Sequence, residues 1–129
     1  MKITVEADER AFDIAAAWRI IGQILKNPDS VIGLSPGQTT KNMHAIVADI
    51  YRQYPFPVSE TIFFNVDELT NLDRSYCGCC YTMIQEQLTG PLGIPEEHFI
   101  MPPTQSDDFE AECRKFEERL DQAGGVDLQ

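Results

Sequence analysis

The feature that most constrains the fold is a regular alternation between short apolar runs and longer amphipathic segments. The apolar runs are rich in β-branched and aromatic residues, and turn-forming residues bound them, as is typical of buried strands. They are VIGL (31–34), TIFFNV (61–66) and HFIM (98–101). Residues 1–5 predict a first strand, and residues 126–128 have the pattern of another strand that begins there.

Four segments between these runs repeat apolar residues at helical spacing, and they are residues 8–26, 39–51, 75–89 and 107–122. In the first segment, the apolar residues recur at spacings of four, three and four, so we expect their face to be buried. They are Ile14, Trp18, Ile21 and Leu25. Strands that alternate with helices predict an α/β fold, an open, mostly parallel, Rossmann-like sheet with helices on both faces.

The length of 129 residues suits one α/β domain, residues 1–129, and is too short for two domains of ordinary size. Gly124 and Gly125 can end the last helix, and the chain then stops as a new strand begins. We therefore expect an apparently truncated fold, the N-terminal part of a longer domain.

The charge balance excludes several classes of partner. The chain has a formal net charge of -11, which disfavours binding to nucleic acid phosphates and to anionic membranes. No apolar run approaches the roughly 20 residues of a membrane span, and no signal-peptide pattern opens the chain. We expect a cytoplasmic protein.

Three of the four cysteines are clustered in the sequence CGCC, as Cys77, Cys79 and Cys80. A zinc site usually needs a second pair of ligands at a matching spacing, whereas His44 and His98 lie far away in sequence. We therefore predict reduced cysteines that pack as small residues, no metal site, and structural roles for both histidines.

Two loops each follow a predicted strand and precede a predicted helix, which is where open parallel sheets bind ligands. The first loop is residues 35–40, where the Gly37, Gln38 and Thr39 amides could face an anion at the start of the helix. The Ser35, Thr39 and Thr40 hydroxyls could add donors. A plain turn with Thr39 as the helix N-cap explains the same residues equally well.

The second loop begins with Asn65, Val66, Asp67 and Glu68. If Phe63 and Phe64 partly exclude water from Asp67, its pKa can rise and the carboxylate can serve as a general base. The alternative is an ordinary solvated strand end with Glu68 pointing outward.

Taken together, the two loops resemble the glucosamine-6-phosphate deaminase/isomerase family, which shares its fold with the 6-phosphogluconolactonases. The matching motifs are Gly33-Leu34, Gly37-Gln38-Thr39, Phe64-Asn65-Val66-Asp67-Glu68 and Ser75-Tyr76, the last at the predicted helix start. The segments PLGIPEEHFIMP and ECRKFEERLDQAGGVDL are also similar to the family, so the resemblance covers nearly the whole chain.

The resemblance implies an amino-sugar-phosphate deaminase that converts glucosamine 6-phosphate or galactosamine 6-phosphate to a ketose 6-phosphate and ammonia. It implies catalytic roles for Asp67 and Glu68, with Asp67 moving a proton between C2 and C1. It implies a phosphate site at Ser35, Gly37, Gln38 and Thr39. Sugar phosphate is the partner we expect, no cofactor is implied, and a homo-oligomer is left open.

Two departures from the family pattern keep alternatives open. Pro36 stands where the family usually has Thr, which removes one hydroxyl and one amide donor, and Leu69 stands where deaminases often have an aromatic residue. The family's ring-opening histidine, in an Asp-Gly-His motif, and its later basic phosphate ligands have no counterpart in the 129 residues. The alternatives are a sugar-phosphate-sensing domain without turnover and a 6-phosphogluconolactonase.

Overall fold

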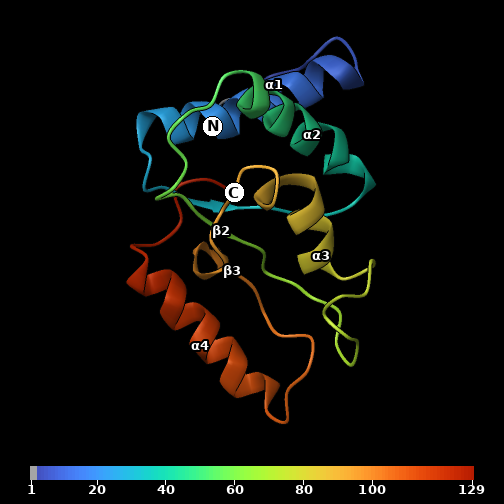
Figure 1. Ribbon diagram of the computed structural model, residues 1–129, viewed down its shortest axis with the longest axis vertical. Helices are drawn as coiled ribbons and strands as arrows, with labels where there is room; N and C mark the ends of the chain where they lie inside the picture. The colour runs from blue at the N-terminus through green and yellow to red at the C-terminus, as the bar shows by residue number, and fades with distance from the viewer. Residues whose placement is uncertain (1–2) are drawn as a thin grey trace.

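A computed structural model describes residues 3–129 and has the alternating architecture that the sequence predicts (Figure 1). The elements in chain order are α1 (Glu9–Lys26), β1 (Val31–Gly33), α2 (Gln38–Gln53), β2 (Ile62–Phe64), α3 (Cys80–Ile84), the π-helical turn η1 (Gln85–Thr89), the 3₁₀ turn η2 (Glu96–His98), β3 (Phe99–Ile100) and α4 (Phe109–Gln122).

The strands form an open parallel sheet in the order β1-β2-β3, which confirms the predicted α/β class. The three central runs are strands where the sequence places them, although each strand is shorter than its run. On the other side of β1, Leu128 forms a parallel bridge with Ile32, and the Gly33 amide donates to the Leu128 carbonyl at 2.8 Å. The predicted last strand is therefore present as a single bridge.

Side chains alternate between the two faces of this sheet and give it two cores. Ile32, Phe63 and Phe99 are opposite one another in the ladder and pack into the larger core, with α1, α2 and α3. Phe64 and Ile100 point to the other face, which α4 covers with Phe116 and Leu120. Helices thus lie on both faces, as predicted, with α1 and α2 above the sheet and α4 below it in Figure 1.

Gly33 leaves room for the aromatic ring of Phe64 on the neighbouring strand. A Cβ atom at Gly33 would stand 2.7 Å from Cζ of Phe64 and 2.9 Å from Cγ of Gln129. Neither separation is possible for real atoms, so this strand position accepts only glycine unless the neighbours move.

The predicted buried face of α1 is wrong for three of its four residues. Ile14, Trp18 and Leu25 are exposed, and only Ile21 is buried. The helix instead buries a neighbouring stripe, which consists of Asp13, Ala17, Ile20, Ile21 and Ile24. Both stripes have helical spacing, and α1 buries the one that contains the small residue Ala17 in the core that it shares with α2.

Two predicted element boundaries are also wrong. Ile3, Thr4 and Val5 form no strand, and Ile3 and Val5 are largely exposed; the rest of that predicted strand, residues 1–2, lies outside the described residues. The helix predicted at 75–89 begins only at Cys80 and finishes as the π-helical turn η1.

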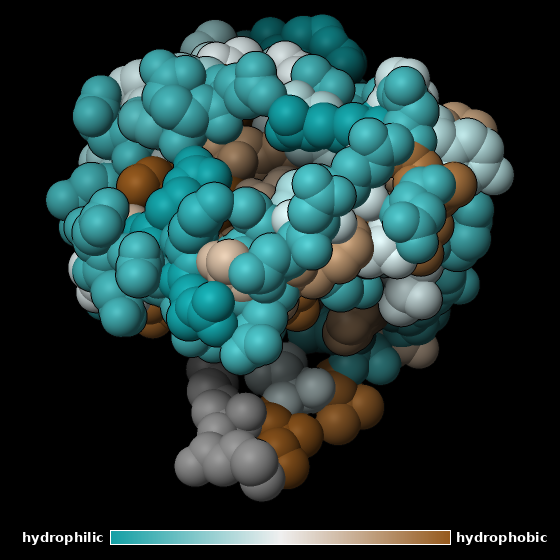
Figure 2. Space-filling model, turned by 90° about the horizontal axis from the view of Figure 1, so that it is seen from below, coloured by the Kyte–Doolittle hydropathy of each residue, from teal (hydrophilic) through white to brown (hydrophobic). Residues whose placement is uncertain are grey.

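The surface seen from below, where α4 lies in Figure 1, is mostly hydrophilic, with apolar side chains visible mainly between the polar ones (Figure 2). Three ion pairs within single helices, including Arg114–Glu110 on α4, lie on exposed helix surfaces. Among residues 3–129, no helix is long and apolar enough to cross a membrane.

Candidate active site

The two candidate loops leave the sheet at the same edge, as the parallel strands require. The Leu34 amide donates to the Phe64 carbonyl at 2.8 Å, and the Asn65 amide donates to the Ile100 carbonyl at 3.2 Å. These bonds extend the ladder one residue past β1 and β2. The loops that start at residues 35 and 66 therefore both leave the sheet at the carboxyl end of its strands. This edge is where a ligand of a parallel sheet is expected.

Asn65 fixes the position of Asp67. The Asn65 side chain is 1% exposed, and its Nδ2 atom donates to the backbone oxygen of Asp67 at 2.6 Å and to its Oδ1 atom at 2.9 Å. Sequence reasoning did not single out Asn65 as a site residue, although it stands in the motif that carries the resemblance. A buried amide that holds an exposed carboxylate is a means of orienting a proton-transfer group.

The surroundings of Asp67 differ from the prediction. Phe63 and Phe64 are buried in the two separate cores, so neither ring shields Asp67, and the Asp67 side chain is exposed to solvent. The Oδ1 atom of Asn65 is buried and has no hydrogen-bond donor among the described residues. Asp67 is therefore oriented by hydrogen bonds rather than by apolar packing.

Glu68 caps the start of α3. Its Oε1 atom accepts from the amides of Leu69 and Cys80 at 2.8 Å each, and its Oε2 atom accepts from the Tyr81 amide at 2.8 Å. A carboxylate at a helix N-terminus satisfies free amides and interacts favourably with the helix dipole. Glu68 thus ties the end of β2 to α3, and its catalytic role stays a prediction.

The cysteines next to this cap are reduced and poorly ionised. Burial, followed by the charge of Glu68, raises the pKa of Cys80 to about 11 and also raises the pKa of Cys79. Cys77 is exposed. Within the described part of the chain, no three His, Cys, Asp or Glu side chains converge in a way that could hold a metal ion.

The loop after β1 presents an uncapped helix end. Gly37 is the N-cap of α2 with φ 126°, a conformation that favours glycine, and no side chain caps this end. The alternative in which Thr39 is the N-cap is therefore wrong, because Thr39 lies in the first turn of the helix. Thr40 Oγ1 donates to the Ser35 carbonyl at 2.6 Å and closes the loop.

The side chains of Ser35, Gln38 and Thr39 are exposed beside this helix end. The first turn of α2 contains no acidic residue. Uncapped amides and the positive end of the helix dipole suit an anion, and the exposed hydroxyls can add hydrogen bonds to it.

Comparison with known proteins shows which enzymes the chain is similar to. No family model matches the chain. A glucosamine-6-phosphate deaminase of Clostridium botulinum (strain Loch Maree / Type A3) is 33% identical over all 129 residues, which cover 53% of that protein. A protein of the same name from Alkaliphilus oremlandii is also 33% identical, with 54% of its length covered. The chain is related to the N-terminal half of glucosamine-6-phosphate deaminases. It spans about half the length of these curated relatives.

Solved structures related to the deaminases share the fold. A monomeric glucosamine-6-phosphate deaminase of the NagB superfamily superposes with a TM-score of 0.91 at 23% identity, over the whole chain and 54% of that protein. A 6-phosphogluconolactonase from Plasmodium vivax superposes with a TM-score of 0.75 at 24% identity, over 95% of the chain and 44% of that protein.

The Ser75-Tyr76 part of the deaminase resemblance does not open a helix here. Ser75 donates through its amide and its hydroxyl to Oδ1 of Asp73, and the Tyr76 amide donates to the Asp73 carbonyl. These bonds form a turn, and the two from Ser75 lower the pKa of the exposed Asp73 carboxyl. The helix begins only at Cys80, where Glu68 caps it.

Both histidines have structural surroundings. His44 lies in α2, is fully buried, and shares a 3.0 Å hydrogen bond with Oε1 of Gln87; burial lowers its pKa. His98 ends η2, and its Nδ1 atom is buried without a described partner. Arg74 pairs with Glu96 at 2.9 Å and stacks on the Tyr81 ring at 3.5 Å, which leaves Lys41 as an exposed cation near the loops.

Proposed function

We propose that this chain carries the phosphate-binding and proton-transfer part of an amino-sugar-phosphate deaminase/isomerase. The observation that carries the proposal is the position of Asp67, which Asn65 holds at the carboxyl end of β2 while the uncapped end of α2 begins at the same edge. The relatives named glucosamine-6-phosphate deaminase support the choice of substrate class.

The phosphate of the sugar would bind at the start of α2, where the amides of Gly37, Gln38 and Thr39 and the hydroxyls of Ser35 and Thr39 are accessible. Pro36 supplies no amide, so this cradle has one donor fewer than a loop without proline. An anion at this end interacts with the helix dipole and places the sugar carbons over the sheet edge.

Asp67 would act on the ring-opened sugar. Its carboxylate removes the proton from C2 while an ammonium proton of the substrate passes to O1, and the resulting carboxylic acid returns a proton to C1, so the aldose becomes a 2-iminoketose. Water then adds at C2, and the amino nitrogen leaves as ammonia to give a ketose 6-phosphate, which is fructose 6-phosphate when the substrate is glucosamine 6-phosphate. One base can serve both neighbouring carbons because they lie on one face of the substrate. Glu68 would keep the loop in place through its three amides.

The test is ammonia release from glucosamine 6-phosphate and galactosamine 6-phosphate, measured on the 129-residue chain and on any longer gene product that contains it. Asp67→Asn should abolish release, whereas Glu117→Gln on the exposed surface of α4 should leave it unchanged. Equal release by wild type and Asp67→Asn, or no release from either sugar by the longest product, would contradict the proposal.

A second candidate is a sugar-phosphate-sensing domain without turnover. It is favoured by the small number of cations at the edge, because Arg74 is engaged with Glu96 and Tyr81 and, of the two cations that lie near the loops in sequence, only Lys41 is left. Binding of glucosamine 6-phosphate without ammonia release would support it. Hydrolysis of 6-phosphogluconolactone in the same preparation would instead support the lactonase alternative.

Three finer points belong to the same proposal. The free cysteines suit a reducing compartment, and we place the protein in the cytoplasm. We assign residues 1–129 to a single α/β domain, as the N-terminal part of a longer one, and self-association is left open. Cell fractionation, a single cooperative unfolding transition and sedimentation at several protein concentrations check these points in turn.

A further inference from the structure

Exposed apolar side chains are concentrated near the start of the chain. Among the described residues, eleven large apolar side chains are exposed, and six of them belong to residues 3–25. Ile3 and Val5 are the extreme cases, at 74% and 88% exposed, and Phe12 is 55% exposed. Single exposed apolar residues need no explanation, but a group of them marks a surface that another protein segment covers.

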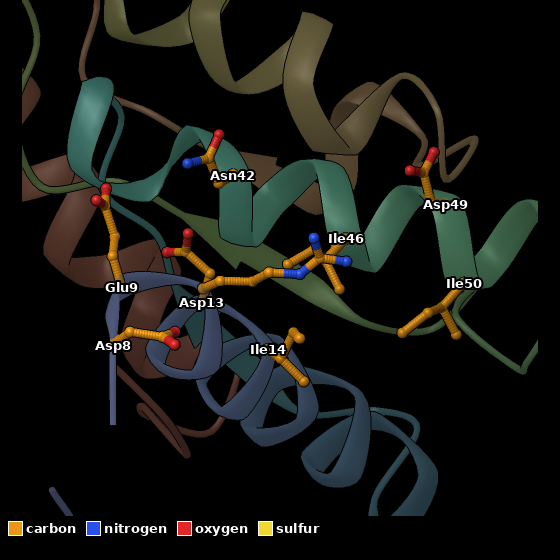
Figure 3. A pocket seen from close by; sticks show the side chains of 9 residues that line it. Asp8, Glu9, Asp13, Ile14, Asn42, Ile46, Asp49 and Ile50 are labelled. Atoms are coloured by element: carbon orange, nitrogen blue, oxygen red, sulfur yellow. The ribbon is translucent and has the colours of Figure 1, made fainter. Parts of the chain in front are cut away.

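The flank of α1 that carries Phe12 faces away from α2. Ile14 lines a cleft between α1 and α2, together with isoleucines of α2 (Figure 3). Phe12 lies two residues earlier, which is about 200° around the helix axis. It lines a separate cleft of about 220 Å³, together with Thr4 and Glu6. The extended residues 3–5 therefore lie beside the free flank of α1.

The topology of the sheet explains why residues 3–5 have no neighbouring strand. The helices α1 and α2 cover the same face, and α2 connects β1 to β2. A right-handed crossover then places a strand before α1 on the side of β1 that faces away from β2. Leu128 already occupies the position next to β1 on that side, through its bridge with Ile32. Residues 3–5 thus belong one strand further out.

The related deaminases contain the chain that could fill this position. The 129 residues cover about half of each relative, so each has a second half with no counterpart here. Strands that add at the free side of an open parallel sheet bring covering helices with them. Strands of a second half that add beyond Leu128 would lie next to residues 3–5, and their helices would lie next to Phe12. The same addition would remove the exposed apolar side chains from water.

We propose that residues 3–5 and the Phe12 flank of α1 form the docking surface for the C-terminal half of a glucosamine-6-phosphate deaminase. Ile3, Thr4 and Val5 pair with the added sheet as a strand, and Phe12 packs against a helix that covers it. The inference rests on the proposed function, because it takes the partner from the same family of enzymes.

The experiment joins the 129-residue chain to the C-terminal half of the Clostridium botulinum relative, from the residue that follows the match. In this chimera, Phe12→Lys should lower the midpoint of thermal unfolding by roughly 5 °C, because the ammonium group would be buried. In the 129-residue chain alone, the same change should shift the midpoint by no more than ~2 °C, because residue 12 is exposed. Tyr54→Lys is the matched control, since Tyr54 is an exposed aromatic residue after α2, and it should shift both midpoints equally.

Copurification tests the same surface without a covalent link. The C-terminal half, co-expressed with the tagged 129-residue chain, should copurify with it, and Phe12→Lys should reduce its recovery roughly tenfold while Tyr54→Lys does not. Failure to copurify with the wild type, or equal losses for the two variants, would overturn the proposal. Self-association of the free chain that Phe12→Lys abolishes would also overturn it, since the surface would then bind a second copy.

Hydrogen exchange and ammonia release separate this inference from the proposed function. Exchange at the Thr4 and Val5 amides should slow roughly tenfold or more in the chimera, because a strand partner would protect them. Unchanged exchange at both amides would overturn the strand pairing. A chimera that shows this protection and the Phe12→Lys effect but releases no ammonia would contradict the proposed function alone.

Discussion

The two faces of the sheet are built differently, although the same three strands supply both. On the face of α1, α2 and α3, fourteen buried residues form one continuous core. On the face of α4, the core consists of Val31, Phe64 and Ile100, and no residue of α4 itself is fully buried. The difference teaches that the first face provides most of the apolar stabilisation, whereas α4 is held by a few aromatic and aliphatic contacts.

The largest expected difference in stability between the two faces comes from removing one aromatic ring from each. Phe63→Ala, in the larger core, should lower the free energy of unfolding by about 3 to 5 kcal/mol. Phe116→Ala, half-buried on α4, should lower it by about 1 to 1.5 kcal/mol, because less apolar surface returns to water. Chemical denaturation followed by circular dichroism measures both, and equal losses would contradict the unequal faces.

A methyl group at Gly33 tests the packing of the α4 face from within the sheet. Gly33→Ala should lower the free energy of unfolding by about 2 kcal/mol, because the new Cβ atom would overlap Phe64 and Gln129. Gly22→Ala is the matched control, since nothing lies within 4 Å of a Cβ atom there and alanine favours a helix. A destabilisation by Gly22→Ala that equals the loss for Gly33→Ala would refute this explanation.

A substitution at Glu68 tests how much its cap stabilises the start of α3, which packs in the larger core. Glu68→Ala should lower the free energy of unfolding by about 1 to 2 kcal/mol, because three amides lose their acceptor. Hydrogen exchange should show the loss at the Cys80 and Tyr81 amides. Unchanged exchange there would indicate that the start of α3 does not depend on Glu68.

The smallest expected effect is a pH dependence from His44 inside the larger core. Burial lowers the His44 pKa below its ordinary 6.5, so the unfolded chain binds a proton more readily than the folded one. Stability should therefore fall as the pH drops below about 6.5, by at most ~1.4 kcal/mol per pH unit, until the lower folded pKa is reached. His44→Gln should flatten this part of the pH profile, and an unaltered slope would exclude His44 as its cause.

The sequence predicts the fold class because each strand and each helix has its own local pattern. Continuous apolar runs require cover on both faces, and helical segments between them require parallel strands, as β1, β2 and β3 demonstrate. The common edge for residues 35–40 and Asp67 follows from the same order. The active-site roles of Asp67, Glu68 and the four phosphate-loop residues remain predictions.

The incorrect predictions have long-range causes that local sequence patterns do not carry. Periodicity alone cannot choose between two adjacent stripes of α1, because the choice depends on which side of α1 packs against α2 in the larger core. The start of α3 depends on Glu68, which lies twelve residues before Cys80. The strand predicted at residues 1–5 needs a neighbouring strand, and Ile3 to Val5 have none among the described residues.

The exposed stripe on α1 also determines how the tryptophan fluorescence of the protein reports on unfolding. Trp18 is its single tryptophan and is 52% exposed in the folded state. Its emission should already be close to that of an indole in water, so unfolding of the larger core should shift the emission maximum little. A fluorescence measurement would therefore underestimate unfolding of the larger core, which circular dichroism follows better.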